Sequence, residues 1–318
     1  MRHKNHIGLL LGITLLLLPS VVFSQAKVGT TGVNFLELGV SARAMGMAEA
    51  FTAGVDDASA VYYNPAALTS IYGRELLFTH ISLPADINYE FIAMALPVEM
   101  VGGVVGIGVF SLNSGDILYT DYSYPYGTDQ SGNKQYFSAG DIAVSLSYGR
   151  YLTDKFSIGA TMKYIREDLF EDYDATGWAV DVGTNYNSGY RNFKIAMLIS
   201  NFGPDMKHIT KEFPLPMNFK FGASIDMVDM DDHLVVFAAE GQHPADNLEK
   251  YNIGLEYRYF DRFSLRIGER MNYDVDGFTA GGGIRLPVGE EVDLTVDYAY
   301  QDFGWLNEVH RFSFSLAF

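Results

Sequence analysis

The sequence predicts an all-β membrane protein, an antiparallel transmembrane β-barrel of about 14 strands with an N-terminal helical hatch. Three features carry this prediction: an export signal at the start of the chain, a long series of alternating apolar and polar segments, and an amphipathic final strand that ends on an aromatic residue. Successive side chains of a strand point to opposite faces, so such segments can face lipid on one side only. In lipid, only helices and closed barrels pair every backbone polar group.

The first 24 residues have the pattern of a secretory signal peptide. Arg2 and Lys4 form a basic start, residues 7–18 form an apolar core, and Ser24 supplies the small residue that a signal peptidase accepts. The core is too short to cross a bilayer as a helix, so we expect a cleaved signal rather than an anchor. The predicted organisation is a signal peptide over 1–24, a hatch over 25–70 and a barrel over 71–318.

The composition narrows the class of protein further. The formal net charge of -17 argues against nucleic acid as a partner, because phosphate binding needs a basic surface. The absence of cysteine excludes a disulfide scaffold and a thiolate metal site. After the signal, no apolar run is long enough for a membrane helix. An exported, aromatic-rich chain of this kind is either a soluble all-β protein or a closed membrane barrel.

Residues 30–69 do not alternate as strands do. Apolar side chains recur in this stretch at helical spacing, at Leu36, Val40, Ala44 and Met47. Intervening glycines lower the helix propensity, so several short, tightly packed helices are expected rather than one long helix. A further helical turn begins at Asn64, with Pro65 suited to its first position. A small helical cap over one end of a sheet is the alternative.

A family resemblance becomes specific in this stretch. Residues 35–51 (FLELGVSARAMGMAEAF) and 56–68 (DDASAVYYNPAAL) resemble the start of the PorV/PorQ family, which are outer-membrane barrels related to the FadL long-chain fatty acid channels. In that superfamily the segment forms a hatch inside the barrel and contains an Asn-Pro-Ala motif. The resemblance therefore implies a hatch role for Asn64, Pro65 and Ala66.

From Gly73 onward the chain is a series of alternating segments separated by turns, an even number as barrels require. The segments are 73–82, 87–97, 103–112, 137–150, 154–166, 176–187, 192–201, 215–225, 233–241, 249–260, 263–271, 277–286, 291–301 and 309–318. Their polar faces include charged residues, namely Asp181, Glu256, Arg258, Arg266, Asp293 and Asp297. Charges on this face indicate a wet lumen with lipid outside.

The first three strands depart from this pattern, because both of their faces are apolar or small. Two explanations stay open: the inner faces pack against the hatch, or they line an apolar pocket for a lipid-like ligand. The candidate residues of such a lumen pocket are Ile92, Met94, Leu96, Val105, Ile107 and Val109.

The last strand is predicted to carry the C-terminal assembly signal. Its apolar stripe consists of Phe312, Phe314, Leu316 and Phe318. A terminal Phe in register with that stripe resembles the signal that the barrel assembly machinery reads in outer-membrane proteins. With Phe318 at the periplasmic rim, the stretches 113–136, 202–214 and 301–308 become the outer loops.

No catalytic constellation is present. The histidines are scattered, none pairs at a spacing suited to zinc on one helix face, and no serine motif suggests an oriented nucleophile. We therefore expect a protein that is not an enzyme and has neither a metal site nor a cofactor. Its expected partners are outer-membrane lipid, the assembly machinery, and either secreted cargo proteins or a hydrophobic small molecule.

Three functions remain for an exported barrel in the bacterial outer membrane. The resemblance places first an accessory of protein secretion or surface display, of the type IX kind. A FadL-like channel for the uptake of hydrophobic small molecules ranks nearly equal, because the apolar faces near residues 91–109 favour it. A structural outer-membrane protein is the third.

Overall fold

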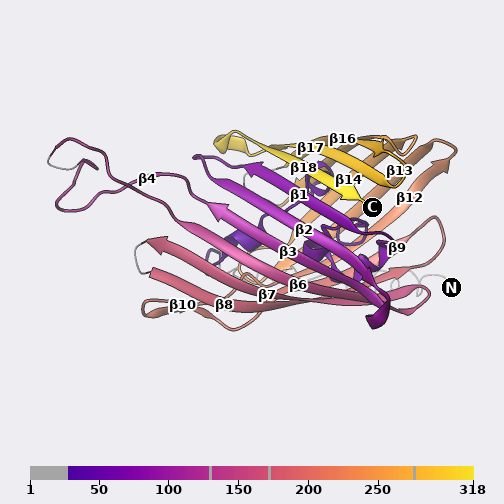
Figure 1. The fold of residues 1–318 in the computed structure, drawn as a ribbon, viewed down its shortest axis with the longest axis horizontal. Helices are drawn as coiled ribbons and strands as arrows, with labels where there is room; N and C mark the ends of the chain where they lie inside the picture. The colour runs from indigo at the N-terminus through magenta and orange to yellow at the C-terminus, as the bar shows by residue number, and fades with distance from the viewer. Residues whose placement is uncertain (1–27, 129–130, 171–172, 275–276) are drawn as a thin grey trace, which may run out of the picture.

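The computed structural model describes residues 28–128, 131–170, 173–274 and 277–318. The predicted signal peptide over 1–24 lies outside the described residues. In the described ranges, 14 antiparallel strands form one closed barrel (Figure 1). They are β1 (Glu75–Ser82), β2 (Asn88–Val98), β3 (Gly103–Asn113), β6 (Gly140–Thr153), β7 (Phe156–Phe170), β8 (Tyr173–Asn187), β9 (Lys194–Phe202), β12 (Asn218–Met230), β13 (His233–Pro244), β14 (Lys250–Tyr259), β15 (Phe263–Met271), β16 (Phe278–Val288), β17 (Val292–Asp302) and β18 (Glu308–Ala317).

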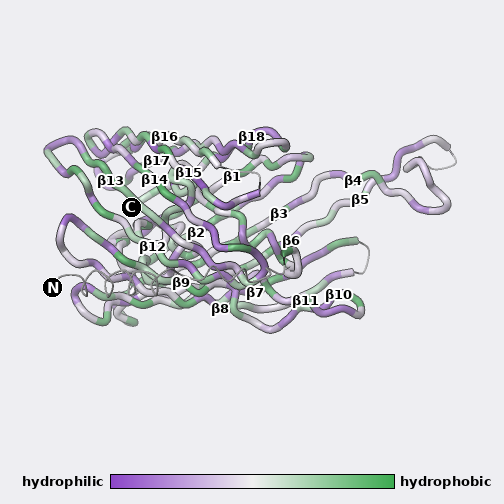
Figure 2. Tube along the Cα trace, turned by 180° about the vertical axis from the view of Figure 1, so that it is seen from behind, coloured by the Kyte–Doolittle hydropathy of each residue, from purple (hydrophilic) through white to green (hydrophobic). Residues whose placement is uncertain are grey.

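The predicted fold class is confirmed, and each predicted segment overlaps one barrel strand. Each strand pairs with its neighbour along the sequence of barrel strands, and β18 closes the barrel on β1. Figure 2 shows hydropathy alternating along the strands, as a wall between lipid and a filled lumen requires. The strands β7 and β8 extend farther at the outer rim than the sequence pattern indicated, whereas β6 begins later there and extends farther at the periplasmic rim.

The two rims differ in their connections. At one rim the turns are short, such as the turn at residues 231–232, and Phe318 lies there; this is the periplasmic rim. The opposite rim carries longer loops with two small sheets. These sheets are β4 (Ile117–Leu118) with β5 (Tyr136–Phe137), and β10 (Met206–His208) with β11 (Lys211–Phe213). Figure 1 shows the β4–β5 arm reaching far from the barrel.

The last strand turns its apolar stripe outward. Phe312 and Phe314 are more than two-fifths exposed on the outer face, whereas Ser313 between them is buried. Phe318 is exposed at the rim, and Leu316 is partly exposed on the same stripe. The side chains of the predicted assembly signal therefore face lipid.

Short helices fill the lumen, as the sequence predicted. They are η1 (Asn34–Glu37), α2 (Ala42–Gly46), α3 (Ala60–Tyr63) and η2 (Pro65–Ser70). The Ser41 side chain caps α2 by accepting a hydrogen bond from the backbone N–H of Ala44. Most of residues 35–69 are buried, and we call this segment the hatch. None of the helices that the structure describes has the length and apolar character needed to cross a membrane.

One hydroxyl joins the hatch to the closing seam of the barrel. The backbone N–H of Ala42 donates to Ser313 Oγ at 2.9 Å. The same oxygen lies 2.7 Å from Thr79 Oγ1 on β1, across the seam between β1 and β18. The start of the hatch and the two terminal strands of the barrel therefore meet at Ser313.

Candidate functional site

The hatch is seated on a row of three glycines. Gly149, Gly159 and Gly183 stand side by side on β6, β7 and β8 and face the lumen. A Cβ atom at Gly159 would overlap the backbone of Pro65 and Ala66, and one at Gly183 would overlap the Asn64 side chain. We call these three positions the glycine seat, because their missing side chains make room for the Asn-Pro-Ala motif.

Asn64 uses its whole amide group in this seat. Its Oδ1 accepts a hydrogen bond from the backbone N–H of Ala66 at 3.1 Å, which caps η2, with Pro65 in the first turn as predicted. Its Nδ2 donates to the carbonyl of Thr52 at 3.0 Å and to that of Thr184 on β8 at 3.1 Å. The motif therefore ties two parts of the hatch to the barrel wall.

Replacing Asn64 by Asp is expected to loosen the hatch. The carboxylate keeps the acceptor for Ala66 but loses both donated bonds, and it faces the carbonyls of Thr52 and Thr184 instead. Each lost buried bond costs roughly 1–3 kcal/mol when a polar group is left unpaired. Hydrogen exchange of residues 60–70 measures the change, and Asn113→Asp, an exposed position on β3, is the control. Equal protection in both variants would contradict this role.

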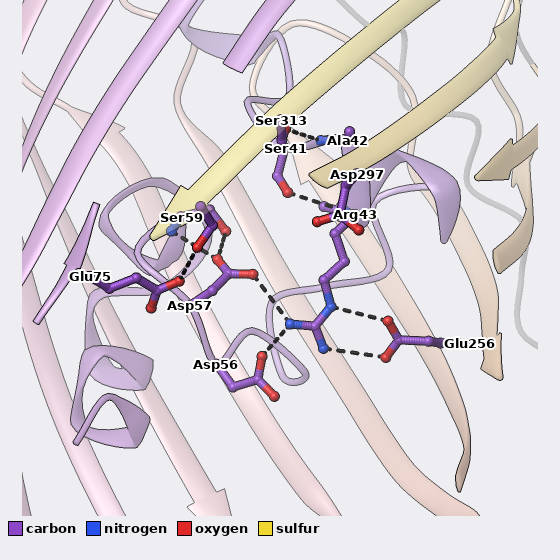
Figure 3. A network of polar contacts seen from close by, with 12 residues as sticks. Ser41, Ala42, Arg43, Asp56, Asp57, Ser59, Glu75, Glu256, Asp297 and Ser313 are labelled. Atoms are coloured by element: carbon purple, nitrogen blue, oxygen red, sulfur yellow. Dashed lines mark hydrogen bonds and ion pairs between the residues drawn. The ribbon is translucent and has the colours of Figure 1, made fainter. Parts of the chain in front are cut away.

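A buried ionic cluster anchors the hatch near the periplasmic end (Figure 3). Arg43 Nε lies 3.1 Å from Glu256 Oε1, and its Nη2 donates to the other carboxylate oxygen at 3.3 Å. Its Nη1 donates to Asp57 Oδ2 at 3.3 Å and is also paired with Asp56. The two aspartates belong to the hatch and Glu256 to β14, so Arg43 joins the hatch both to itself and to the wall.

Charged side chains from three strands form the wall side of this cluster. Arg266 Nε donates to Glu256 Oε1 at 2.7 Å, and its Nη1 donates to Asp297 Oδ1 at 2.6 Å. Arg258 Nε lies 3.3 Å from Glu256 Oε2. Glu256 has only 1% of its side chain exposed, so its charge depends on these partners. The predicted charged inner face is thus confirmed at this level of the barrel.

The two aspartates respond differently to their surroundings. Burial raises the pKa of Asp56, but the adjacent Arg43 outweighs burial and leaves that pKa below its usual value. Burial raises the pKa of Asp57 more than Arg43 lowers it, and the charge of Asp56 adds to the rise. Arg43 therefore holds a cluster in which one carboxyl is readily ionised and the other less so.

A second anchor lies toward the outer half of the lumen. Glu49 of the hatch is 3.5 Å from Arg311 on β18 and 3.7 Å from Arg270 on β15. Burial raises the pKa of Glu49, but the two arginines outweigh it and the pKa is lowered. Glu240 on β13 accepts the backbone N–H groups of residues 51 and 52 at 3.2 and 3.0 Å. Charged side chains of the barrel wall therefore bind the hatch at two levels of the lumen.

Small cavities flank the hatch. A polar cavity of about 310 Å³ opens at its periplasmic side, lined in part by Arg43, Asp57 and Glu75. On the outer side a pocket of about 40 Å³ lies between Glu49, Tyr62 and Lys220. The hatch separates the two spaces, so the lumen of the barrel is blocked in this structure.

One side of the lumen is apolar along most of its length, interrupted on β1 by Thr79. We call this series the apolar column; from the outer rim to the periplasmic end it comprises Leu83, Leu112, Ile81, Tyr89, Phe91, Phe110, Leu77 and Ile71. In the periplasmic half of the apolar column, wall residues such as Gly106 on β3 are small. Val61 and Leu68 of the hatch occupy the space beside Gly106. The first explanation for the apolar strands, packing against the hatch, is thereby confirmed.

The predicted lumen pocket is wrong in its residues. Ile92 and Ile107 are 46% and 45% exposed on the outer face of the barrel. The other four residues, Met94, Leu96, Val105 and Val109, alternate with inward positions of β2 and β3 and share that outer face. Where β2 and β3 pass Val61 and Leu68 of the hatch, their inward positions are small, because the hatch leaves no room there for larger side chains.

The sequence reasoning missed the hatch side of both ionic anchors. Arg43 is the only basic residue between residues 28 and 73, in a stretch where most side chains are small or apolar. A lone arginine there needs a buried carboxylate partner, and the acidic pair at 56–57 offered one. Among the described residues, no group of three or more His, Cys, Asp or Glu is arranged to hold a metal ion.

Fold and site together define a β-barrel closed by an internal hatch, whose apolar outer face fits a multi-pass protein of the bacterial outer membrane. No protein family profile matches the chain, and no curated protein sequence matches it. Solved structures do. The toluene transporter TodX of Pseudomonas putida matches with a TM-score of 0.57 at 12% identity, over 88% of this chain and 97% of that one.

Two further structures agree with this match. The toluene transporter TbuX of Ralstonia pickettii gives a TM-score of 0.56 at 14% identity, over 86% of this chain and 96% of that one. A FadL homologue of Pseudomonas aeruginosa gives 0.51 at 12% identity, over 88% and 98%. The chain thus has the fold of FadL-like outer-membrane barrels. These neighbours are transporters and channels rather than enzymes, and PorV/PorQ membership stays a prediction.

Proposed function

We propose that this protein is an outer-membrane channel for small hydrophobic molecules and that the hatch is its gate. The apolar column carries the proposal, because it offers apolar contacts from the outer rim to the periplasmic end of the lumen. The toluene transporters with the same fold suggest monoaromatic or similar compounds as the substrate class.

Passage along the column requires the hatch to shift. Val61 and Leu68 fill the periplasmic half of the apolar column, beside the small wall residues Ala93 and Gly106. If α3 and η2 move away from β2 and β3, an apolar passage opens between the hatch and these small wall residues. The shift involves the whole hatch, so the ionic anchors on the opposite side, around β14 and β15, must give way with it.

An engineered disulfide tests the gate directly. A Cβ built at Gly222 on β12 lies 3.5 Å from the Cβ of Ala53 in the hatch, at the short end of the range for a disulfide. The chain has no cysteine, so Ala53→Cys with Gly222→Cys forms the only possible bridge. Under oxidising conditions, uptake of labelled toluene is expected to fall to the level of a deletion strain, and a reductant restores it.

The two single-cysteine variants are the controls, since neither can form an internal bridge. Uptake that is the same in the bridged and reduced protein would overturn the gate. A deletion strain that takes up toluene like the wild type would overturn the channel itself. Selective loss of surface proteins in that strain would instead favour the secretion accessory that the PorV/PorQ resemblance implies.

A further inference from the structure

The small pocket on the outer side of the hatch has two chemically different sides. Its volume is about 40 Å³, whereas roughly 10–15 Å³ is enough for one water-sized group, so it has room for a hydroxyl group and the adjoining edge of a ring. Asn218 and Lys220 on β12 belong to its polar side. Leu36 and Tyr62 of the hatch and Leu198 on β9 belong to its apolar side. A well-matched occupant therefore combines a polar end with an apolar body.

The side chain of Asn218 offers this pocket a hydrogen-bond acceptor. Gln242 Nε2 donates to Glu240 Oε1 at 3.0 Å, and Asn218 Nδ2 donates to Gln242 Oε1 at 3.2 Å. This chain of hydrogen bonds fixes the Asn218 amide, because its nitrogen must face the oxygen of Gln242. Asn218 is only 7% exposed, and its Oδ1 accepts no hydrogen bond from the described residues. A buried carbonyl oxygen of this kind requires a donor.

Lys220 offers a donor beside that acceptor. It follows Asn218 by two positions on β12, so both side chains lie on the same, inner face of the strand. Its side chain is 10% exposed, and its Nζ is 4.0 Å from Glu240 Oε1, which is too long for a hydrogen bond. The same Nζ lies 5.7 Å from the centroid of the Tyr62 ring. The ammonium therefore has an ionic and an aromatic contact, and it retains N–H donors for a further partner.

The Tyr62 ring joins this pocket to the apolar column. Its centroid is 6.1 Å from that of Phe110, which belongs to the column. Leu36 and Leu198 on the apolar side of the pocket are each 1% exposed. A ligand whose polar end lies at Lys220 therefore has its apolar body beside the column, and a ring enters the column when the hatch shifts.

We infer that this pocket selects aromatic substrates that carry a hydroxyl group, an inference that rests on the proposed channel function. The hydroxyl oxygen accepts a hydrogen bond from the Lys220 ammonium, and the hydroxyl donates to Asn218 Oδ1. A hydrocarbon leaves both buried groups unpaired and so binds more weakly. A carboxylate has no proton for Asn218 Oδ1, and it meets the carboxylates of Glu37 and Glu49, which line the same pocket. The neutral hydroxyl satisfies both partners.

Two probes of the same shape test this selectivity. In p-cresol a hydroxyl group replaces one methyl group of p-xylene, and the two groups are similar in size. Each compound is added unlabelled to cells that express the protein, and the uptake of labelled toluene above that of a deletion strain is measured. This readout does not depend on other routes by which p-cresol enters the cell. We expect p-cresol to inhibit toluene uptake at about one-tenth of the p-xylene concentration, the effect of one hydrogen bond to a charged group.

Variants of the two polar residues assign the preference to the pocket. Asn218→Leu removes the acceptor without changing any charge, and Lys220→Met removes the donor. In both variants p-cresol and p-xylene should inhibit toluene uptake equally. Lys194→Met is the control, because Lys194 lines a small cavity beside Arg43 on the periplasmic side of the hatch, and it should keep the preference.

The outcomes separate this inference from the proposed function. Equal inhibition by the two compounds in the wild type, or a preference for p-cresol that survives Asn218→Leu, would overturn the inference and leave the channel in place. Toluene uptake by the wild type that does not exceed that of the deletion strain would overturn the proposed function and this inference with it.

Discussion

Replacing Arg43 by Met is expected to release the hatch from the periplasmic half of the barrel. The variant leaves Asp56 and Asp57 without their guanidinium partner, whereas Glu256 keeps Arg266 and Arg258. Removing one partner of a buried ion pair costs about 3–5 kcal/mol, and the remaining partners of Glu256 put this case at the lower end. Amide exchange over residues 34–70 should become about 100-fold faster.

Acid should partly repair this variant. In the wild type, Arg43 keeps the pKa of Asp56 lowered, so the pair stabilises the hatch above the unfolded pKa of about 3.9 and loses this effect only as the pH falls through the lowered value. Without Arg43, burial alone raises the pKa of both aspartates, and protonation removes the unpaired charges. The defect should therefore be smaller near about pH 5 than near about pH 8.

Arg262→Met is the matched control, because Arg262 is exposed in the short turn between β14 and β15. Its exchange profile should equal that of the wild type. If the two variants protect residues 34–70 equally, the ionic cluster does not hold the hatch.

Replacing Gly159 by Val is expected to unseat the Asn-Pro-Ala motif. The new side chain overlaps the backbone of Pro65 and Ala66, which cannot yield as a flexible side chain can. Overpacking a well-filled interior costs about 1–3 kcal/mol or more, and here the hatch can escape the cost by leaving the wall. The barrel keeps its strand pairing at this position, so we expect an assembled protein that conducts ions in a planar bilayer where the wild type is closed.

The comparison variant is Gly282→Val on β16. This glycine pairs with Leu265 and Tyr298, which face lipid, and the nearest atom to its added Cβ is a carbonyl oxygen at an ordinary 3.5 Å. The same change of residue there should leave the closed state intact. Conductance in neither variant, with both barrels assembled, would show that the seat is not needed for closure.

The barrel could be predicted from the sequence because one face of most strands is polar. Alternation in segments such as 249–260 and 291–301 gives both the strand and its orientation. On β2 and β3 the alternation has no polar face, so the pattern gave the strands but not which side was inner. Where these strands pass the hatch, the inward residues are small, namely Ala93, Ala95 and Gly106. Nearer the outer rim the inward residues are large, namely Tyr89, Phe91 and Phe110, so side-chain size alone does not identify the inner face.

The site was less predictable, because its partners lie far apart in the sequence. The Asn-Pro-Ala motif and its helix start were visible locally, since a cap and the proline that follows it are adjacent residues. The pairing of Arg43 with Glu256 spans 213 residues, and the glycine seat requires the register of three strands. Neither pattern could be read from single segments.

The shared hydroxyl of Ser313 has a consequence for how the chain is assembled. The hatch precedes every barrel strand in the sequence, yet the group that fixes α2 stands on the last strand, β18, 271 residues after Ala42. Closing a loop of that length is entropically costly and slow, so docking of α2 and zipping of β18 onto β1 are expected to be one late cooperative event. The barrel strands then assemble around the hatch, and the barrel closes between β1 and β18 only when the hatch is already inside.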